Sequence, residues 1–169
     1  MKKLVVGAMV LILVSINIFP EDMDSMYSDL NFPDSKNLAE VQKFIEKIAP
    51  FDAKPEDLID RYGVPEKVLE EKIFDSVHIH YYFENAGEFI FSEEEILMIW
   101  IIEETEIKNL NIPFSNKMEV LKQFGKPDKD YKARYMDFGD RVFYRYDSSE
   151  LYIYFNEDET LRKICWTIP

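Results

Sequence analysis

The sequence predicts an α+β protein of two tandem units, each a short helix packed on a four-stranded antiparallel sheet, with an extra N-terminal helix. Residues 58–67 (LIDRYGVPEK) and 120–129 (VLKQFGKPDK) share one pattern: two apolar residues, two polar residues, an aromatic, Gly, a variable residue, Pro, an acid and Lys. Runs of alternating polarity follow each copy, as expected for strands. The hydrophobic content of 47% predicts a folded core and not a disordered chain.

Each repeated stretch has the features of a short helix with a fixed end. Its apolar and aromatic residues have the i, i+1, i+4 spacing that places them on one helix face. Gly63 and Gly125 follow directly, and a glycine there can take the left-handed conformation that ends a helix. A proline two residues later prevents the helix from resuming. Asp52 and Ser115 stand where caps are expected near the helix starts.

The first unit begins with an additional helix. Residues 35–48 carry apolar side chains at helical spacing, and Ser35 is the expected cap. Beyond each helix-end motif, the alternating runs are joined by turns so short that neighbouring strands must be antiparallel. We therefore expect strands at residues 67–74, 77–84, 88–91 and 96–102 in the first unit, and at 131–138, 141–146, 150–155 and 161–168 in the second.

The N-terminus has the pattern of an export signal. Lys2 and Lys3 precede an apolar run at residues 4–14, which is short for a membrane span of roughly 20 residues. We expect an extracytoplasmic protein, periplasmic or secreted, that contacts a membrane only if this segment is retained. The predicted organisation is an export signal or anchor (1–20), a flexible lead-in (21–34), the first unit (35–102), a linker (103–112) and the second unit (113–169).

The chain is acidic, with a formal net charge of −13 at pH 7. Nucleic acid and anionic lipid surfaces are poor partners for such a chain. A charge of this size is explained by the need to keep the protein soluble, and it also suits a basic protein partner. Cys165 is the single cysteine, so no disulfide can form within the chain, and we expect a buried, unreactive thiol.

Strand alternation divides the side chains of each sheet between a face under the helix and an outward face. In the second unit the outward face carries aromatic and arginine side chains, which bury well against protein partners. The alternative is that this face is core between the two units, because positions 97, 99 and 101 are also apolar and require a cover. The candidate partner-binding residues are Tyr82, Phe143, Arg145, Tyr152 and Tyr154.

His78 and His80 lie on one strand face, which is a metal-ligand geometry. A zinc site needs three or four ligands and the chain has two histidines, so we interpret them as polar residues of a half-exposed strand. The sequence contains no phosphate loop, nucleotide fingerprint, nucleophile elbow or zinc-protease motif. We expect no cofactor and no enzymatic activity. A small-ligand or metal-binding envelope protein is the alternative function.

The repeated unit resembles a known family. A helix ending in aromatic-Gly-x-Pro-acid (residues 62–66 and 124–128), followed by Tyr-rich strands, an acidic turn and a closing strand, resembles the SmpA/OmlA outer-membrane assembly lipoproteins. It is also similar to the tandem-repeat β-lactamase inhibitor proteins. The resemblance covers about residues 50–168, although the chain lacks a lipid-attachment cysteine and the two-helix start of each unit. It implies a non-catalytic protein-binding module with an aromatic sheet face in the region of Tyr82, Phe143, Tyr152 and Tyr154.

Overall fold

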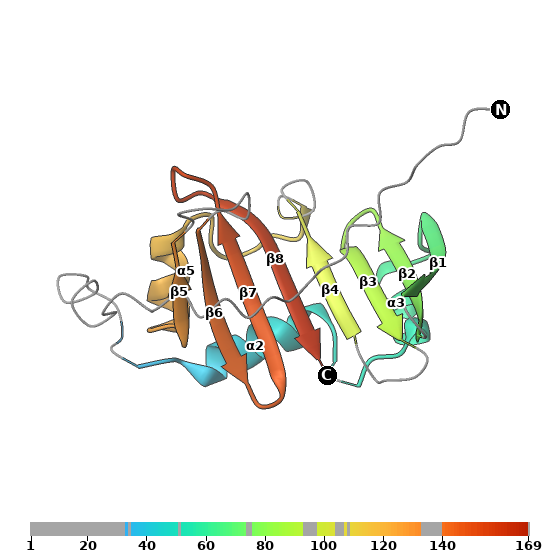
Figure 1. Cartoon of the computed structure of the whole chain (residues 1–169), viewed down its shortest axis with the longest axis horizontal. Helices are drawn as coiled ribbons and strands as arrows, with labels where there is room; N and C mark the ends of the chain where they lie inside the picture. The colour runs from blue at the N-terminus through green and yellow to red at the C-terminus, as the bar shows by residue number, and fades with distance from the viewer. Residues whose placement is uncertain are drawn as a thin grey trace.

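The computed structural model describes residues 33, 35–50, 52–73, 76–92, 98–103, 107, 109–132 and 140–168. The predicted export signal, nearly all of the lead-in, and position 97 lie outside these ranges. Within them the protein is α+β, with three helices and one eight-stranded antiparallel sheet (Figure 1), so the predicted fold class is confirmed at this level. None of the described helices is long and apolar enough to span a bilayer.

The strands follow the alternating runs of the sequence closely. The fifth strand is the exception. It was expected at residues 131–138, but the described strand covers residues 129–131, and residues 133–138 lie outside the described ranges. The strands are β1 (Lys67–Ile73), β2 (Ser76–Phe83), β3 (Gly87–Ser92), β4 (Met98–Ile102), β5 (Lys129–Tyr131), β6 (Asp140–Tyr146), β7 (Ser149–Phe155) and β8 (Leu161–Ile168), in the spatial order β1-β2-β3-β4-β8-β7-β6-β5.

The two groups of four strands meet edge to edge. Strand β4 pairs with β8, and Trp100 lies opposite Trp166 at this seam. Both indoles are buried, at 1% and 0% exposure, and the Trp100 Nε1 donates a hydrogen bond of 2.7 Å to the Ala86 carbonyl. One continuous sheet therefore results, and the alternative in which the outward faces of two sheets cover each other is not the arrangement observed.

The three helices are α2 (Leu38–Ile48), α3 (Pro55–Tyr62) and α5 (Lys117–Phe124). The predicted caps were wrong at all three. Asn37 caps α2 by accepting from the Glu40 amide, two residues beyond Ser35, and Asn116 caps α5 directly after Ser115. Helix α3 begins at Pro55, beyond Asp52. Several polar residues precede each helix, and the sequence alone does not rank them as caps.

The helices cover one face of the sheet. Helix α2 buries Val41, Phe44, Ile45 and Ile48, and the Phe44 ring lies 5.6 Å from that of Phe124 on α5. Removing such side chains from water contributes roughly 1.5–3 kcal/mol each. Figure 1 shows α2 crossing the part of the sheet formed by β6, β7 and β8. The additional helix of the first predicted unit thus packs on the second half of the sheet.

The two repeated glycines have the same local conformation. Gly63 has φ +87° and Gly125 has φ +72°, and each amide donates a hydrogen bond of 2.8 Å to the carbonyl four residues earlier. Their surroundings differ. A Cβ at Gly125 would lie 2.1 Å from the Ser35 carbonyl oxygen, whereas a Cβ at Gly63 would meet nothing within 4 Å. Only the second glycine is required by close backbone packing as well as by its φ angle.

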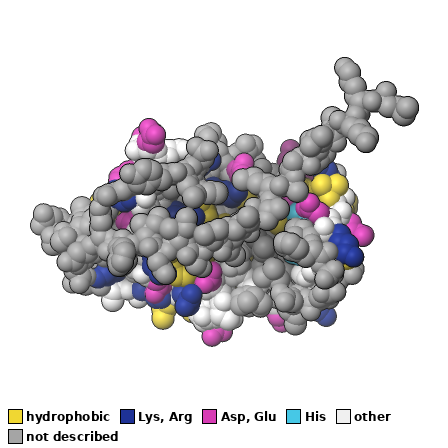
Figure 2. All heavy atoms as spheres, viewed as in Figure 1, with side chains coloured by type: hydrophobic (Ala, Val, Ile, Leu, Met, Phe, Trp, Pro, Cys, Tyr) yellow, Lys and Arg dark blue, Asp and Glu magenta, His cyan; other side chains and the backbone are white. Residues whose placement is uncertain are grey.

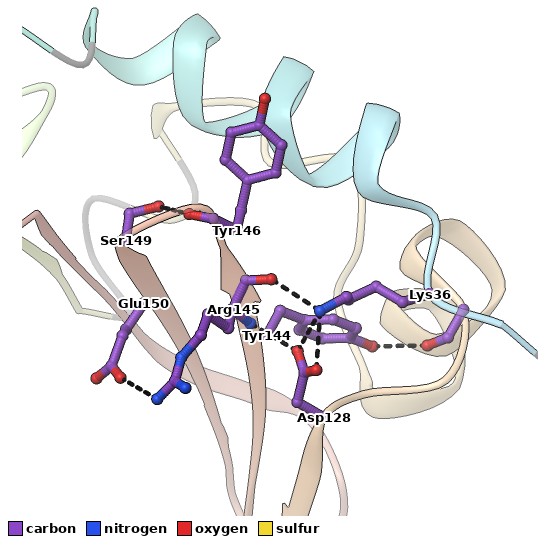
Figure 3. Close-up of polar contacts among 8 residues, drawn as sticks. Lys36, Asp128, Tyr144, Arg145, Tyr146, Ser149 and Glu150 are labelled. Carbon is purple, nitrogen blue, oxygen red and sulfur yellow. Dashed lines mark hydrogen bonds and ion pairs between the residues drawn. The ribbon is translucent and has the colours of Figure 1, made fainter.

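A polar network fixes the start of α2 beside the end of α5 and β6 (Figure 3). The Lys36 ammonium donates to both carboxylate oxygens of Asp128, at 2.8 and 2.7 Å, and to the Arg145 carbonyl at 2.8 Å. Asp128 also accepts from the Arg145 amide at 2.7 Å. The buried Tyr144 hydroxyl donates to the Gly125 carbonyl at 2.9 Å. Each of these polar groups is therefore satisfied at the junction.

The glycine pair provides a matched test of this packing. We expect Gly63→Ala to lower the free energy of unfolding by about 1–3 kcal/mol, because alanine is strained at this backbone conformation. Gly125→Ala carries the same strain and an overpacking cost of roughly 1–3 kcal/mol more. Urea unfolding of both variants measures the difference. Equal losses would contradict the close approach of Ser35.

Candidate partner-binding surface

All five predicted site residues lie on the sheet face turned away from the helices, here called the distal face. On β6, Val142 and Tyr144 are buried under the helices, and the Tyr144 ring lies 5.5 Å from that of Phe124. Alternation therefore turns Phe143 and Arg145 to the other side. Register extends this face across the sheet through the pairs Phe143↔Tyr152, Tyr152↔Cys165, Cys165↔Ile101, Ile101↔Glu88 and Glu88↔Tyr82.

The structure brings four of the five residues together and separates the fifth. Phe143, Arg145, Tyr152 and Tyr154 lie on the adjacent strands β6 and β7. Tyr82 lies in the same cross-strand row but on β2, four strand spacings from β7 and five from β6, which is roughly 19–24 Å at about 4.8 Å per strand. A strand order that joins β4 to β8 could not be read from either unit alone.

The four neighbouring residues form a packed set. The rings of Phe143 and Tyr152 lie 4.9 Å apart, and the Arg145 guanidinium lies 5.6 Å from the Phe143 ring centroid. Glu150 accepts hydrogen bonds of 2.9 Å from both Arg145 and the Tyr152 hydroxyl. Phe143 is only 4% exposed. It therefore supports the surrounding side chains and offers little surface of its own.

Arg141 is the centre of this surface, although it was not among the predicted site residues. Its guanidinium carbon lies 4.7 Å from the ring centroid of Tyr131, 5.7 Å from Tyr154 and 5.9 Å from Tyr152. Strand parity places Arg141 on the same face as Phe143, two residues away, and that signal was sufficient to find it. The aromatic cluster comprises Tyr131, Arg141, Phe143, Arg145, Tyr152 and Tyr154.

The environment keeps the hydroxyls of Tyr152 and Tyr154 protonated. Burial raises the pKa of Tyr152, and the hydrogen bond to Glu150 and the charge of that carboxylate raise it further. Burial also raises the pKa of Tyr154 and Cys165 adds to the effect, while Arg141 acts in the opposite direction. These phenols are neutral hydrogen-bonding groups at physiological pH, and the arginines supply the positive charge.

Tyr82 belongs to a second group that includes the histidines. His80 stacks on Tyr82 with ring centroids 6.4 Å apart, and its Nδ1 lies 2.7 Å from a Glu88 oxygen while Nε2 lies 3.7 Å from Glu71. Burial, followed by the hydrogen bond and charge of Glu88, raises the pKa of Tyr82 to about 12. His78 lies two residues before His80, opposite Ser92. The described residues contain no group of three or more potential metal ligands.

A shallow hollow lies elsewhere, at the junction of α2 and α3. Its lining is formed by Pro50, Asp52, Lys54, Asp57, Asp60 and Arg61. Small-molecule sites are usually concave and mostly apolar. The charged lining of this hollow does not match that description, and it contains none of the predicted site residues.

Comparisons with known proteins add little to this description. The chain is similar to a solved structure of a DUF4309 family protein, YjgB, from Bacillus subtilis subsp. subtilis str. 168, with 12% sequence identity and a TM-score of 0.40 over 78% of this chain and 95% of that chain. No protein-family model matches the chain, and no curated protein matches it. The resemblance drawn from the helix-end motif therefore remains an expectation.

Cys165 lies in the middle of the distal face, and its thiol should react slowly. Burial raises the pKa of Cys165 to about 11, so the thiolate at pH 8 is rarer by roughly 100-fold than in the unfolded chain. We expect alkylation of the native protein to be roughly 10-fold slower than that of the urea-unfolded protein, because the greater nucleophilicity of a high-pKa thiolate offsets part of its scarcity. Mass spectrometry over time measures both rates, and similar rates would contradict the burial.

Proposed function

We propose that the protein is an exported, non-enzymatic interaction module that binds a protein partner through the aromatic cluster of the distal face. The observation that carries the proposal is the gathering of three tyrosines around Arg141, with Glu150 orienting Tyr152 and Arg145. Tyr and Arg dominate the energetics of many protein interfaces. Rings already held by neighbours lose little conformational freedom when a partner docks.

The positive charges of the aromatic cluster suggest which side chains of the partner contact it. No described carboxylate forms an ion pair with Arg141, and Arg145 is exposed with one partner, Glu150. A partner carboxylate beside Arg141 would complete a charge-assisted hydrogen bond next to three aromatic rings. The net charge of −13 still favours a basic partner at long range. We propose a partner that is basic overall and whose contact residues include a carboxylate.

The tandem organisation forms part of the same proposal. In this proposal the chain consists of two helix-plus-sheet units whose strands form one sheet. Two observations support it: the equivalent glycine caps, and the pairing of Trp100 with Trp166 where the units meet. The aromatic cluster then belongs to the second unit, and Tyr82 marks a separate position on the first. A partner would contact both only if it extended across most of the sheet.

Site-specific photo-crosslinking tests the proposed surface. A benzophenone side chain at Tyr154 should give adducts with a protein from the envelope fraction of the source organism. The matched control is the same side chain at Lys43, which is 77% exposed on α2. Adding Arg141→Ala should remove the adducts at position 154, with a change in unfolding free energy below about 1 kcal/mol for this partly exposed side chain. Adducts of equal yield at both positions would exclude the aromatic cluster as the docking surface.

The pH dependence of crosslinking tests whether the protonated and charged groups of the aromatic cluster are the basis of binding. The raised pKa of Tyr152 keeps its hydroxyl protonated from pH 6 to pH 9, and arginine stays charged throughout. We therefore expect a constant adduct yield across this range. A loss of adducts within this pH range would instead exclude this set of protonated and charged groups as the basis of binding.

A further inference from the structure

Strand β1 is at one edge of the sheet (Figure 1), and its residues from Lys67 to Lys72 are exposed. In the sheet order β1 neighbours β2 alone. The strand at the opposite edge, β5, spans only three residues. A long unpaired edge presents backbone N–H and C=O groups that can pair with another strand.

Exposed apolar side chains gather beside this edge. Val68 is 50% exposed and Leu69 is 40% exposed, and Val64 just before the strand is 86% exposed. With Ile59, these are four of the five large hydrophobic side chains that are exposed in the described residues. Figure 2 shows hydrophobic, basic and acidic side chains side by side at this end of the molecule. Such a mixed patch at an open strand edge is typical of an association surface.

We propose that β1 is a homodimer interface in which two copies of the chain pair edge to edge and antiparallel, with Leu69 on the two-fold axis. In this register Leu69 faces the second copy's Leu69, and Lys67 faces the second copy's Glu71 in both directions. All three side chains share the distal face, since they pair in register with Tyr82, His80 and His78 of β2. The sheet then continues across both copies, as in a symmetric two-fold interface.

The charges of β1 select this register over its neighbours. A two-fold axis at Glu70 would place that carboxylate opposite its own copy. An axis at Val68 would place Glu66 opposite the second copy's Glu70. Like charges directly across an antiparallel pair are destabilising, whereas opposite charges and apolar pairs are favourable. The sequence of β1 is therefore self-complementary about Leu69, which is why a second copy fits better than an unrelated strand.

Disulfide trapping tests the register. In the full chain carrying Cys165→Ala, Leu69→Cys should form a disulfide-linked dimer, because the two introduced thiols face each other across the axis. Val68→Cys in the same background is the matched control, since that side chain lies on the other face and meets Glu70. We expect crosslinking at residue 69 to be at least 10-fold faster. Equal rates, or faster crosslinking of Glu70→Cys, would overturn the proposal.

Sedimentation equilibrium and a charge exchange test the interface without a crosslink. The full chain should form a concentration-dependent dimer near 100 μM and be mostly monomeric near 1 μM, because the contact is small for a stable interface. Salt at about 150 mM limits repulsion between two acidic copies. Lys67→Glu and Glu71→Lys should each abolish the dimer, and the double variant should restore it. A wild-type monomer at all concentrations, or a monomeric double variant that is still folded, would overturn the proposal.

Discussion

The close approach of the Ser35 backbone to Gly125 decides how the helices are arranged on the sheet. The oxygen of Ser35 occupies the space that a Cβ at residue 125 would need, and the adjacent Lys36 is fixed by Asp128 and the Arg145 carbonyl. These contacts place the first turn of α2 against the end of α5. From there α2 can lie across β6 to β8 and bury its apolar side. The same contacts hold the backbone of β6, which carries half of the aromatic cluster.

Local patterns were sufficient to predict most elements of the fold. The glycine-proline stops predicted where α3 and α5 end, and period-two alternation predicted the strands and the side of the sheet to which Tyr144 and Phe143 point. Long-range pairing left no such signal. Nothing in either unit indicated that β4 would pair with β8, or that α2 would pack on the half of the sheet that lies further along the chain. Contacts of this kind depend on the shapes of both halves together.

The candidate surface shows the same division between local and long-range information. Parity correctly assigned Tyr152 and Tyr154 to one face with Phe143, because neighbouring strands in a hairpin share their register. It placed Tyr82 on that face as well, but distance across the sheet depends on strand order, and this residue lies with His80 instead. Arg141 was not among the predicted site residues, although strand parity places it on the same face as Phe143 and Arg145. Its importance comes from three rings that converge on it from β5 and β7.

The position of β8 determines when the sheet can be completed during synthesis. It is the last of the described strands in sequence, yet it lies between β4 and β7 in the middle of the sheet. Until residues 161–168 leave the ribosome, the first four strands end in an open β4 edge, with Trp100 lacking its neighbour across the seam. A half-made sheet of this kind is prone to aggregate. The complete sheet therefore forms only after residues 161–168 have been synthesised.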